Sequence, residues 1–221
     1  MVARLALPIL GMALLLPVGC APTTPGPSGA VATQPAPQPA WVNLMDSTRV
    51  KQWKVIQGAA SLDSNAILLN TGAGRDTTIL AEGVDLQDGE VELEFRRLES
   101  PLHDMPVTIA LRLPVRIDWT SVYIICRPEQ VEACRGSALR RQPPAEHVQR
   151  MDKAQASPEV WRFVMTGGLV ECFRFGRKVL SYVDPRPRAG TIALTASNCG
   201  VTVSAIRYRP VEKPRTGPER R

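Results

Sequence analysis

The stretch DGEVELEFRR, residues Asp88–Arg97, alternates charged and apolar side chains. Glu90, Glu92 and Glu94 occupy every second position, and valine, leucine and phenylalanine fill the positions that follow them. Successive side chains of a strand point to opposite faces, so this pattern predicts a β-strand with one apolar face and one face of carboxylates.

Short strands separated by turn residues continue from residue 41 to residue 210. Strand-like segments lie at 107–115, 121–127, 190–197 and 201–209, and a hairpin is expected at 60–74. Residues 160–183 are predicted to form three strands joined by tight turns at Gly167-Gly168 and Gly176-Arg177. No stretch shows helical periodicity over three turns. The sequence therefore predicts an all-β domain at 41–210, a two-sheet antiparallel β-sandwich of the jelly-roll type.

The first 40 residues have the features of an export signal followed by a linker. Arg4 precedes an apolar run, Leu5–Leu16, which is shorter than the ~20 residues that a membrane-spanning helix needs. The run ends in LLPVGC, which resembles a bacterial lipobox with Gly19 directly before Cys20. Residues 1–19 are therefore predicted to be a signal peptide and Cys20 the lipid-modified N-terminus of a proline-rich linker, residues 20–40. An ordinary secretory signal cleaved nearby and a retained anchor are the alternatives.

A lipid at Cys20 would place the protein in a bacterial cell envelope, anchored to the membrane on its periplasmic or cell-surface side. The net charge is +6, and the basic segment 211–221 is predicted to be a disordered tail. Such a surface could touch anionic lipid head groups or acidic envelope polymers. Export argues against a nucleic-acid partner.

The cysteines beyond Cys20 are even in number, and their positions are Cys126, Cys134, Cys172 and Cys199. In an exported protein an even number predicts two disulfides. The favoured pairs are Cys126–Cys134, which would close a short loop, and Cys172–Cys199, which would join two later strands. Isolated buried thiols are the alternative. The sequence has no CxxC pair and no histidine near a cysteine, so neither a metal site nor a cofactor is expected.

The order of these features resembles that of concanavalin A-like domains. WVNLMDSTRVKQWKVIQGAASLDSNAILLN, from residue 41, is similar to their opening segment, and DGEVELEFR is similar to their next strand. PEVWRFVMTGGLVECFRFGRKVLSYVD and AGTIALTASNCGVTVSAIRYR are similar to their closing segments. Together these segments match the laminin-G-like jelly rolls of the 3-keto-disaccharide hydrolase-type group. The resemblance implies the fold far more strongly than an activity.

Glu90 and Glu94 are candidate catalytic residues. Family 16 glycoside hydrolases share this fold and carry an E-x-D-x-E motif, which EVELE resembles with Glu92 in place of the aspartate. That chemistry needs two carboxylates roughly 5–9.5 Å apart, whereas residues four apart on a strand lie roughly 13 Å apart. The pair therefore qualifies only if the strand curves. The alternative is a solvated strand face whose carboxylates pair with cross-strand arginines such as Arg112.

Arg112, Asp118 and Trp119 are candidate ligand-binding residues. Many members of the family carry an Asn-Ser-Gly segment and an arginine after the DGEVELEFR-type strand. The matching place here reads MPVTIALRLPV and retains only Arg112, with Ile109, Leu111 and Leu113 expected on one face. Trp119 offers a ring that could stack on a sugar, and Asp118 lies beside it.

Residues 135–159 are predicted to form a long polar loop that includes Arg140, Arg141, Arg150 and Lys153. It could line a groove for an acidic glycan or a partner protein, or it could be a mobile insertion. Three functions remain open. The first is a non-catalytic module that binds polysaccharide or another envelope component, and the second is a glycoside-cleaving hydrolase. The third is a structural or accessory lipoprotein that binds another protein.

Overall fold

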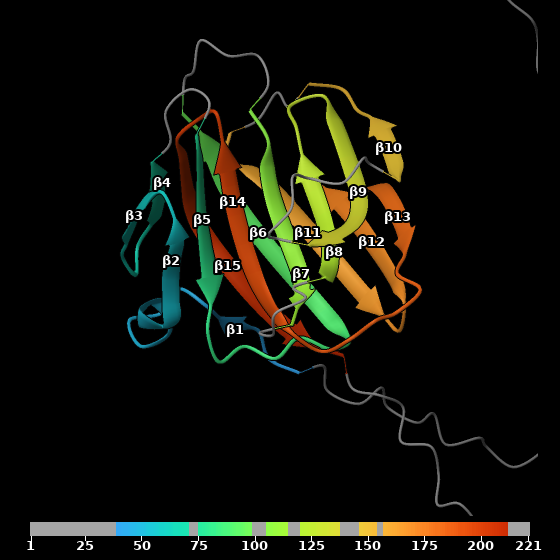
Figure 1. Cartoon of the computed structure of the whole chain (residues 1–221), viewed down its shortest axis with the longest axis horizontal. Helices are drawn as coiled ribbons and strands as arrows, with labels where there is room; N and C mark the ends of the chain where they lie inside the picture. The colour runs from blue at the N-terminus through green and yellow to red at the C-terminus, as the bar shows by residue number, and fades with distance from the viewer. Residues whose placement is uncertain are drawn as a thin grey trace, which may run out of the picture. The chain divides into compact units, whose positions relative to one another are not determined.

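The computed structural model describes residues 39–70, 75–98, 105–114, 120–137, 146–153 and 157–211. Within them, two antiparallel β-sheets face each other across one apolar core (Figure 1). This confirms the predicted all-β sandwich. Cys20, Asp118 and Trp119 lie outside the described residues, as do the predicted signal peptide and most of the predicted linker and tail. Within the described part of the chain, no helix is long and apolar enough to cross a membrane.

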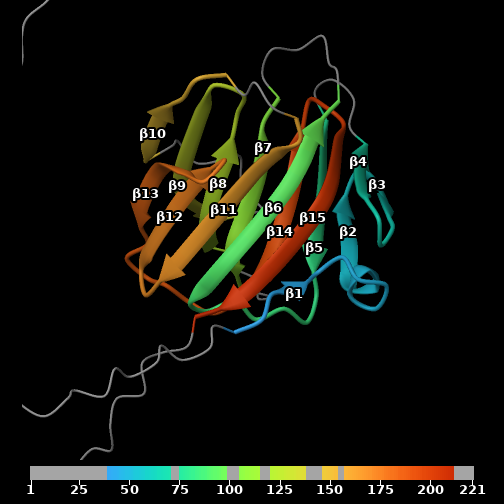
Figure 2. The same ribbon diagram turned by 180° about the vertical axis from the view of Figure 1, so that it is seen from behind.

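The first sheet, sheet A, contains eight strands. Its order from one edge is β13 (Arg177–Val183), β12 (Leu169–Arg174), β11 (Glu159–Thr166), β6 (Gly89–Arg97), β15 (Val201–Pro210), β4 (Ile67–Asn70) and β3 (Ala59–Leu62). The short β1 (Val42–Asn43) also pairs with β15. Figure 2 shows this sheet from its outer side, with β6 between β11 and β15.

The second sheet, sheet B, contains seven strands. Its order is β10 (His147–Arg150), β9 (Gln130–Ser137), β8 (Thr120–Cys126), β7 (Val107–Leu113), β14 (Thr191–Ser197), β5 (Asp76–Ala81) and β2 (Trp53–Gln57). A short 3-10 helix, η1 (Arg49–Gln52), precedes β2. The last two strands of the fold, β14 and β15, take central places in opposite sheets, so the end of the chain ties the two layers together.

The core forms from the alternation that the sequence shows. In β6, Val91, Leu93 and Phe95 are fully buried between the sheets. Trp161 and Phe163 of the neighbouring β11 are buried beside them, with their rings stacked at a centroid distance of 6.3 Å. Burying a side chain of this size contributes roughly 1.5–3 kcal/mol. The apolar face predicted from DGEVELEFRR is therefore part of the main core.

The two hairpin turns predicted from glycine show one success and one error. The β11–β12 turn is Gly167-Gly168, as predicted. In the next hairpin Arg174 pairs with Arg177, so the turn is Phe175-Gly176 and not the predicted Gly176-Arg177. Both turn residues have positive φ, 49° and 78°, as a type I′ turn requires. The prediction was wrong by one residue because such a turn places its glycine second.

The predicted loop at 135–159 is interrupted by a strand. β9 extends into it as far as Ser137, and β10 pairs with β9 further along. All four residues of β10 are exposed. A short strand without apolar alternation gives no periodic signal, so the sequence predicts a loop at this place.

At Arg112 the alternation of side chains between the two faces of β7 is interrupted. Ile109 and Leu111 belong to the main core, whereas Leu113 packs with Ala110 in a small separate cluster. The expectation that Leu113 shares a face with the other two is therefore wrong. Arg112 has a φ of 56°, in the left-handed region, and the pairing register with β14 shifts at the same place. This irregularity breaks the two-residue alternation.

Neither predicted disulfide is present among the four cysteines of the described residues. Cys126 points into the core, whereas Cys134 follows the core-facing Ala133 and lies on the opposite face of sheet B. Two side chains on opposite faces of one sheet cannot form a disulfide. Burial raises the pKa of Cys126 to about 12 and that of Cys134 to about 11, so both thiols stay protonated at neutral pH.

The second expected pair, Cys172–Cys199, is separated by the sheet itself. Cys172 lies in β12, and Cys199 directly precedes β15. Two strands, β11 and β6, stand between β12 and β15. Neighbouring strands are about 4.8 Å apart, so three spacings amount to roughly 14 Å, beyond the ~7 Å that a disulfide allows between Cα atoms. The alternative of isolated buried thiols describes the structure.

Candidate functional site

The predicted carboxylate row lies on the outer face of sheet A. Glu90 forms ion pairs with Arg209 at 2.8 Å and with Arg162 at 3.6 Å. Glu92 pairs with Arg207. Two of these arginines come from β15 and one from β11, the two strands that flank β6. Cross-strand arginines therefore neutralise Glu90 and Glu92, which confirms the predicted ion-paired strand face for these two glutamates.

The third member of the row, Glu94, accepts a hydrogen bond from Ser204 Oγ at 2.7 Å. Glu90 and Glu94 lie on one continuous strand, so their Cα atoms are roughly 13 Å apart at ~3.3 Å per residue. The limit of about 9.5 Å for glycosidases applies to the carboxylates and not to the Cα atoms, so the contacts of the two side chains decide between the readings. The geometry favours the paired strand face over a catalytic pair.

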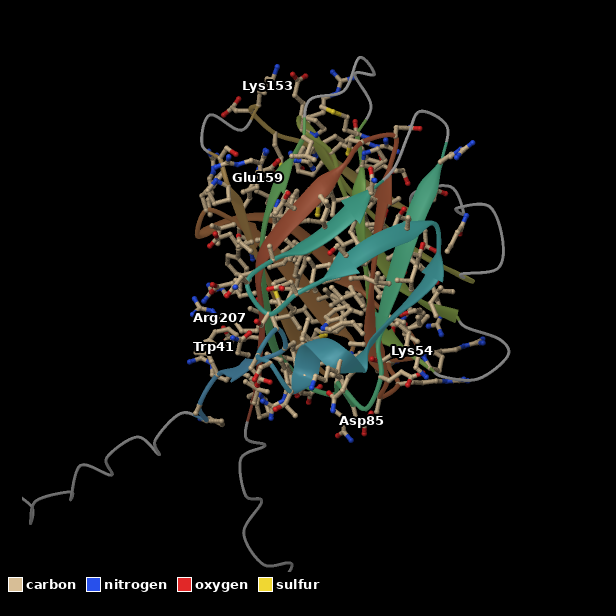
Figure 3. The ribbon with its side chains drawn as sticks, turned by 90° about the vertical axis from the view of Figure 1, so that its left-hand side faces the viewer. Trp41, Lys54, Asp85, Lys153, Glu159 and Arg207 are labelled. Atoms are coloured by element: carbon tan, nitrogen blue, oxygen red, sulfur yellow. The ribbon has the colours of Figure 1, made fainter. Side chains whose placement is uncertain are left out.

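Trp41 is covered by the arginines of β15. The guanidinium of Arg207 lies 5.1 Å from the centroid of the Trp41 ring, and that of Arg209 lies 4.7 Å from it. Figure 3 shows Trp41 and Arg207 next to each other at one end of sheet A. Cation–π contacts of this kind hold the start of the domain against β15.

Arg112 joins the two sheets. Its buried guanidinium pairs with Asp88 at 3.0 Å and donates to the carbonyl oxygens of Gln87 at 2.8 Å and Gly167 at 2.6 Å. These groups belong to the start of β6 and the β11–β12 turn, across the sandwich from β7. Burial lowers the pKa of Arg112, and the neighbouring Asp88 opposes that shift. Arg112 therefore has a structural position, and it is not the partner of the glutamate row that the sequence suggested.

An open groove lies between edge strands of the two sheets. β10 of sheet B and β13 of sheet A run along the same side of the sandwich (Figure 1), and the groove beside them has a volume of about 930 Å³. One wall is the end of β10 with the segment that follows it, and the other is the β12–β13 turn with β13. The charged residues of its lining are Arg150, Asp152, Lys153, Arg174, Arg177 and Lys178.

Main-chain hydrogen bonds fix the β10 wall. The N–H of Met151 donates to the carbonyl oxygen of Glu129 at 2.8 Å. Arg174 Nη1 donates to the carbonyl oxygens of Asp152 and Pro128, each at 3.1 Å. One guanidinium from β12 thus connects the floor of the groove, its wall and the β8–β9 turn. The wall is held through its backbone, so its cationic side chains remain exposed.

Behind the groove, Arg174 belongs to a buried charge cluster. The Glu159 carboxylate pairs with Arg174 Nη2 at 2.8 Å and also with Arg97, and none of the three side chains is more than 9% exposed. Arg97 donates to the carbonyl oxygens of Met105 at 2.8 Å and Cys126 at 2.6 Å. Burial lowers the pKa of Arg97 to about 10. In a buried environment of this kind, removing one charged partner leaves the other without compensation for its lost hydration.

Phe175 presents an aromatic ring at the mouth of the groove. It is the first residue of the β12–β13 turn, and its φ of 49° lies in the left-handed region that bulky side chains avoid. Its side chain is 44% exposed, with the Arg174 guanidinium 5.8 Å from the ring centroid. Asparagine or glycine would fit this turn position with less strain. Strained backbone positions of this kind cluster at ligand-binding and active sites.

The sequence identified part of this groove. Arg150 and Lys153 had been singled out as candidates to line a groove, and both do so. Their companions in that prediction, Arg140 and Arg141, lie outside the described residues. The sequence analysis does not single out Phe175, because it predicts only a tight turn that joins two strands at this place. The available signal was a phenylalanine at the place where Phe-Gly replaces the usual Asn-Gly of a type I′ turn.

Metal binding has no support in the described part of the chain, where no group of three or more histidine, cysteine, aspartate or glutamate side chains could hold an ion. The groove itself offers guanidinium and ammonium groups, the Asp152 carboxylate, the Gln149 amide, its backbone and the Phe175 ring.

Comparisons with known proteins agree with the architecture. The chain matches no protein-family model and no curated protein sequence. Among solved structures it resembles the carbohydrate-binding module CBM66 from Bacillus subtilis, with 9% identity over 72% of this chain and 95% of that chain and a TM-score of 0.61. The carbohydrate recognition domain of Emp47p has 13% identity over 81% of this chain and 100% of that one, with a TM-score of 0.60. The Crh5 transglycosylase in complex with NAG has 13% identity over 80% and 86%, with a TM-score of 0.59. At these identities the likeness concerns the fold, and the chain has the jelly-roll fold of concanavalin A-like domains.

Proposed function

We propose that this domain is a non-catalytic carbohydrate-binding module whose ligand lies in the groove between β10 and β13. The observation that carries the proposal is the exposed ring of Phe175, held in a strained turn at the mouth of an open groove. A planar ring stacks on the C–H-rich face of a sugar, while the surrounding donors bind its oxygens.

The groove has the dimensions of a ligand site. Its volume of about 930 Å³ lies at the upper end of the ~300–1,000 Å³ typical of ligand pockets, enough for a short stretch of a polysaccharide. Its β10 wall is fixed by the hydrogen bonds of Met151 and Arg174, so little ordering is needed on binding. Two of the structural relatives carry carbohydrate binding or recognition in their names, which supports the same class of ligand.

The alternative of a glycoside-cleaving enzyme rests on Glu90 and Glu94 and on the likeness to a transglycosylase. Glu90 is held by two arginines and Glu94 by Ser204, and their strand lies on the outer face of sheet A. The binding module is therefore the better-supported function.

The setting of the module is proposed from the sequence. The lipobox-like LLPVGC would anchor the chain through Cys20, and the proline-rich linker would hold the domain away from the membrane. In this proposal the protein is an exported envelope lipoprotein related to the 3-keto-disaccharide hydrolase-type group. Its domain would hold polysaccharide or another envelope component near the membrane. An accessory role in binding a partner protein is the remaining alternative.

Native affinity gels test the binding function. Soluble polysaccharides of varied composition are cast into the gels, and a retarded band identifies a ligand. Phe175→Ala should weaken the affinity measured from that retardation by roughly 2- to 12-fold, which corresponds to about 0.5–1.5 kcal/mol for an aromatic contact. Phe173→Ala is the matched control, because Phe173 lies on the outer face of sheet A under Arg162. The proposal is wrong if no polysaccharide retards the wild-type domain, or if both variants bind as it does.

A further inference from the structure

We propose that the groove selects acidic polysaccharides, binding the carboxylate or sulfate groups of a glycan chain between its two walls. The inference rests on the proposed function, because it names the class of glycan that the same site takes. Three features of the groove carry it: unpaired cations, their placement on opposite walls, and the recessed position of the site.

The cations of the groove are paired differently from those of sheet A. On sheet A, Arg162, Arg207 and Arg209 are matched by Glu90 and Glu92. In the groove, the exposed Arg150, Lys153 and Arg177 have no carboxylate partner among the residues that the structure describes, which is the first feature.

The cations of the lining outnumber its carboxylates, and this excess of positive charge has a cost in stability. Like charges at one site repel each other, and an anionic ligand would relieve that repulsion. The lining holds one carboxylate, Asp152, and the backbone of that residue is engaged by Arg174. Lys178 does pair with Glu171 at 2.9 Å, but Lys178 is exposed and Glu171 only half-buried, so the pair is weak and open to competition.

The placement of the cations suits a chain with repeated anionic groups. Arg150 and Lys153 belong to the β10 wall, whereas Arg177 follows the β12–β13 turn on the opposite wall. A glycan lying along the groove would therefore meet cations on both sides. The planar guanidinium of arginine pairs with carboxylate or sulfate oxygens through two parallel hydrogen bonds. Phe175, next to Arg177, adds a surface for the sugar ring itself.

The recessed site favours a polysaccharide over other anionic partners. A flat bilayer could meet the exposed cations, but it offers no sugar face on which the exposed ring of Phe175 could stack. Single-stranded nucleic acid is bound by rows of aromatic rings on which successive bases stack. Among the described lining residues Phe175 is the single aromatic one.

Binding of uronic-acid polymers and their neutral counterparts tests the inference. The wild-type domain is titrated with polygalacturonate, alginate and hyaluronan and with the same polymers after methyl esterification of their carboxylates. We expect at least one acid form to bind at least 10-fold more tightly than its ester. Dextran sulfate and plain dextran are compared in the same way to test recognition of sulfate groups. Between 50 and 200 mM NaCl the affinity for the acid form should fall roughly 10- to 50-fold, as for about three to four ion pairs.

A double variant tests the residues themselves. Arg150→Gln with Arg177→Gln should lower the affinity for the acid polymer at least 10-fold. Lys51→Gln with Arg75→Gln removes the same charge from exposed sites outside the groove and should leave the affinity within 2-fold. Thermal unfolding verifies that both variants are folded.

The outcomes separate this inference from the proposed function. Equal binding of acid and ester forms, lost in Phe175→Ala, would overturn the acidic selectivity while leaving a glycan-binding groove. Absence of binding to every polymer would overturn both. Equal affinity for anionic phospholipid vesicles or single-stranded DNA would also refute selection of polysaccharides, and so would equal losses in the two double variants.

Discussion

Removing the charge of Glu159 should destabilise the domain strongly. In Glu159→Gln the side chain keeps its size and an oxygen acceptor, but the carboxylate between Arg97 and Arg174 disappears. Glu159 is 9% exposed, and the arginine side chains are 7% and 5% exposed, so water cannot replace the lost charge. Two buried guanidinium groups would then face each other without a counter-ion.

The size of the effect follows from those contacts. Breaking a buried ion pair by removing one partner costs about 3–5 kcal/mol, and the retained amide oxygen places Glu159→Gln near the lower end. For a domain of this size each kcal/mol lowers Tm by about 2–4 °C. The free energy of unfolding should therefore fall by about 3 kcal/mol and Tm by roughly 6–12 °C.

Urea denaturation followed by tryptophan fluorescence measures the change, and Trp161, whose indole N–H donates to Glu159 at 3.2 Å, lies at the altered place. Glu171→Gln is the control, because its pair with Lys178 is exposed and should contribute less than about 1 kcal/mol. Adding Arg97→Met should cost at least about 1 kcal/mol less in the Glu159→Gln background than in the wild type. A loss below about 1 kcal/mol for Glu159→Gln, or additive costs in the double variant, would refute the reasoning.

Three further predictions concern the turn, a buried thiol and the N-terminus. Phe175→Asn should raise the free energy of unfolding by about 0.5–1 kcal/mol in urea titrations, since asparagine accepts positive φ, yet lower glycan binding; a loss of stability would contradict the strained turn. Burial raises the pKa of Cys126 from 9.0 to about 12, so the thiol ionises more readily in the unfolded chain than in the folded domain. The buried thiol therefore lowers the free energy of unfolding progressively as the pH rises from about 9 to about 12. From pH 8 to pH 10, Cys126→Ala should therefore lose about 1 kcal/mol less stability than the wild type, and identical pH profiles would exclude that role. Cys20→Ala should move the expressed protein from the membrane to the soluble fraction, whereas unchanged fractionation would exclude lipid anchoring at this residue.

The sequence predicted the fold where strands alternate strictly. DGEVELEFRR predicted the correct strand and the correct buried face, because both are consequences of local periodicity. The predicted ion pairing holds for Glu90 and Glu92, whereas Glu94 binds Ser204. The partners of the glutamates were assigned wrongly. Arg112 looked available on an adjacent strand, but pairing between strands is decided by topology, and the observed partners come from β15, far along the chain.

Local irregularities of the backbone explain other differences between the predictions and the structure. The left-handed backbone at Arg112 reverses the facing of Leu113, and no residue type in the segment announces it. The disulfide prediction depended on the even number of cysteines. That number carries no information on the faces of the sheet, and Cys126 and Cys134 occupy opposite faces. The groove is only partly predictable for a similar reason. The sequence shows that Arg150 and Lys153 are charged, but the residues of the opposite wall come close to them only through the packing of the two sheets.

The position of the groove also bears on self-association. In the part of the chain that the structure describes, β10 and β13 are the last strands of their sheets, so each has an outer edge that a strand of another chain could extend. Val148 on β10 and Val183 on β13 are 53% and 66% exposed and would favour such an added strand. Arg150, Arg177 and Lys178 place positive charge along these same edges, and charged edges resist docking of a second, equally charged copy. A polyanion that neutralises them would remove this protection, so a long acidic polymer could gather several copies of the domain edge to edge along its length.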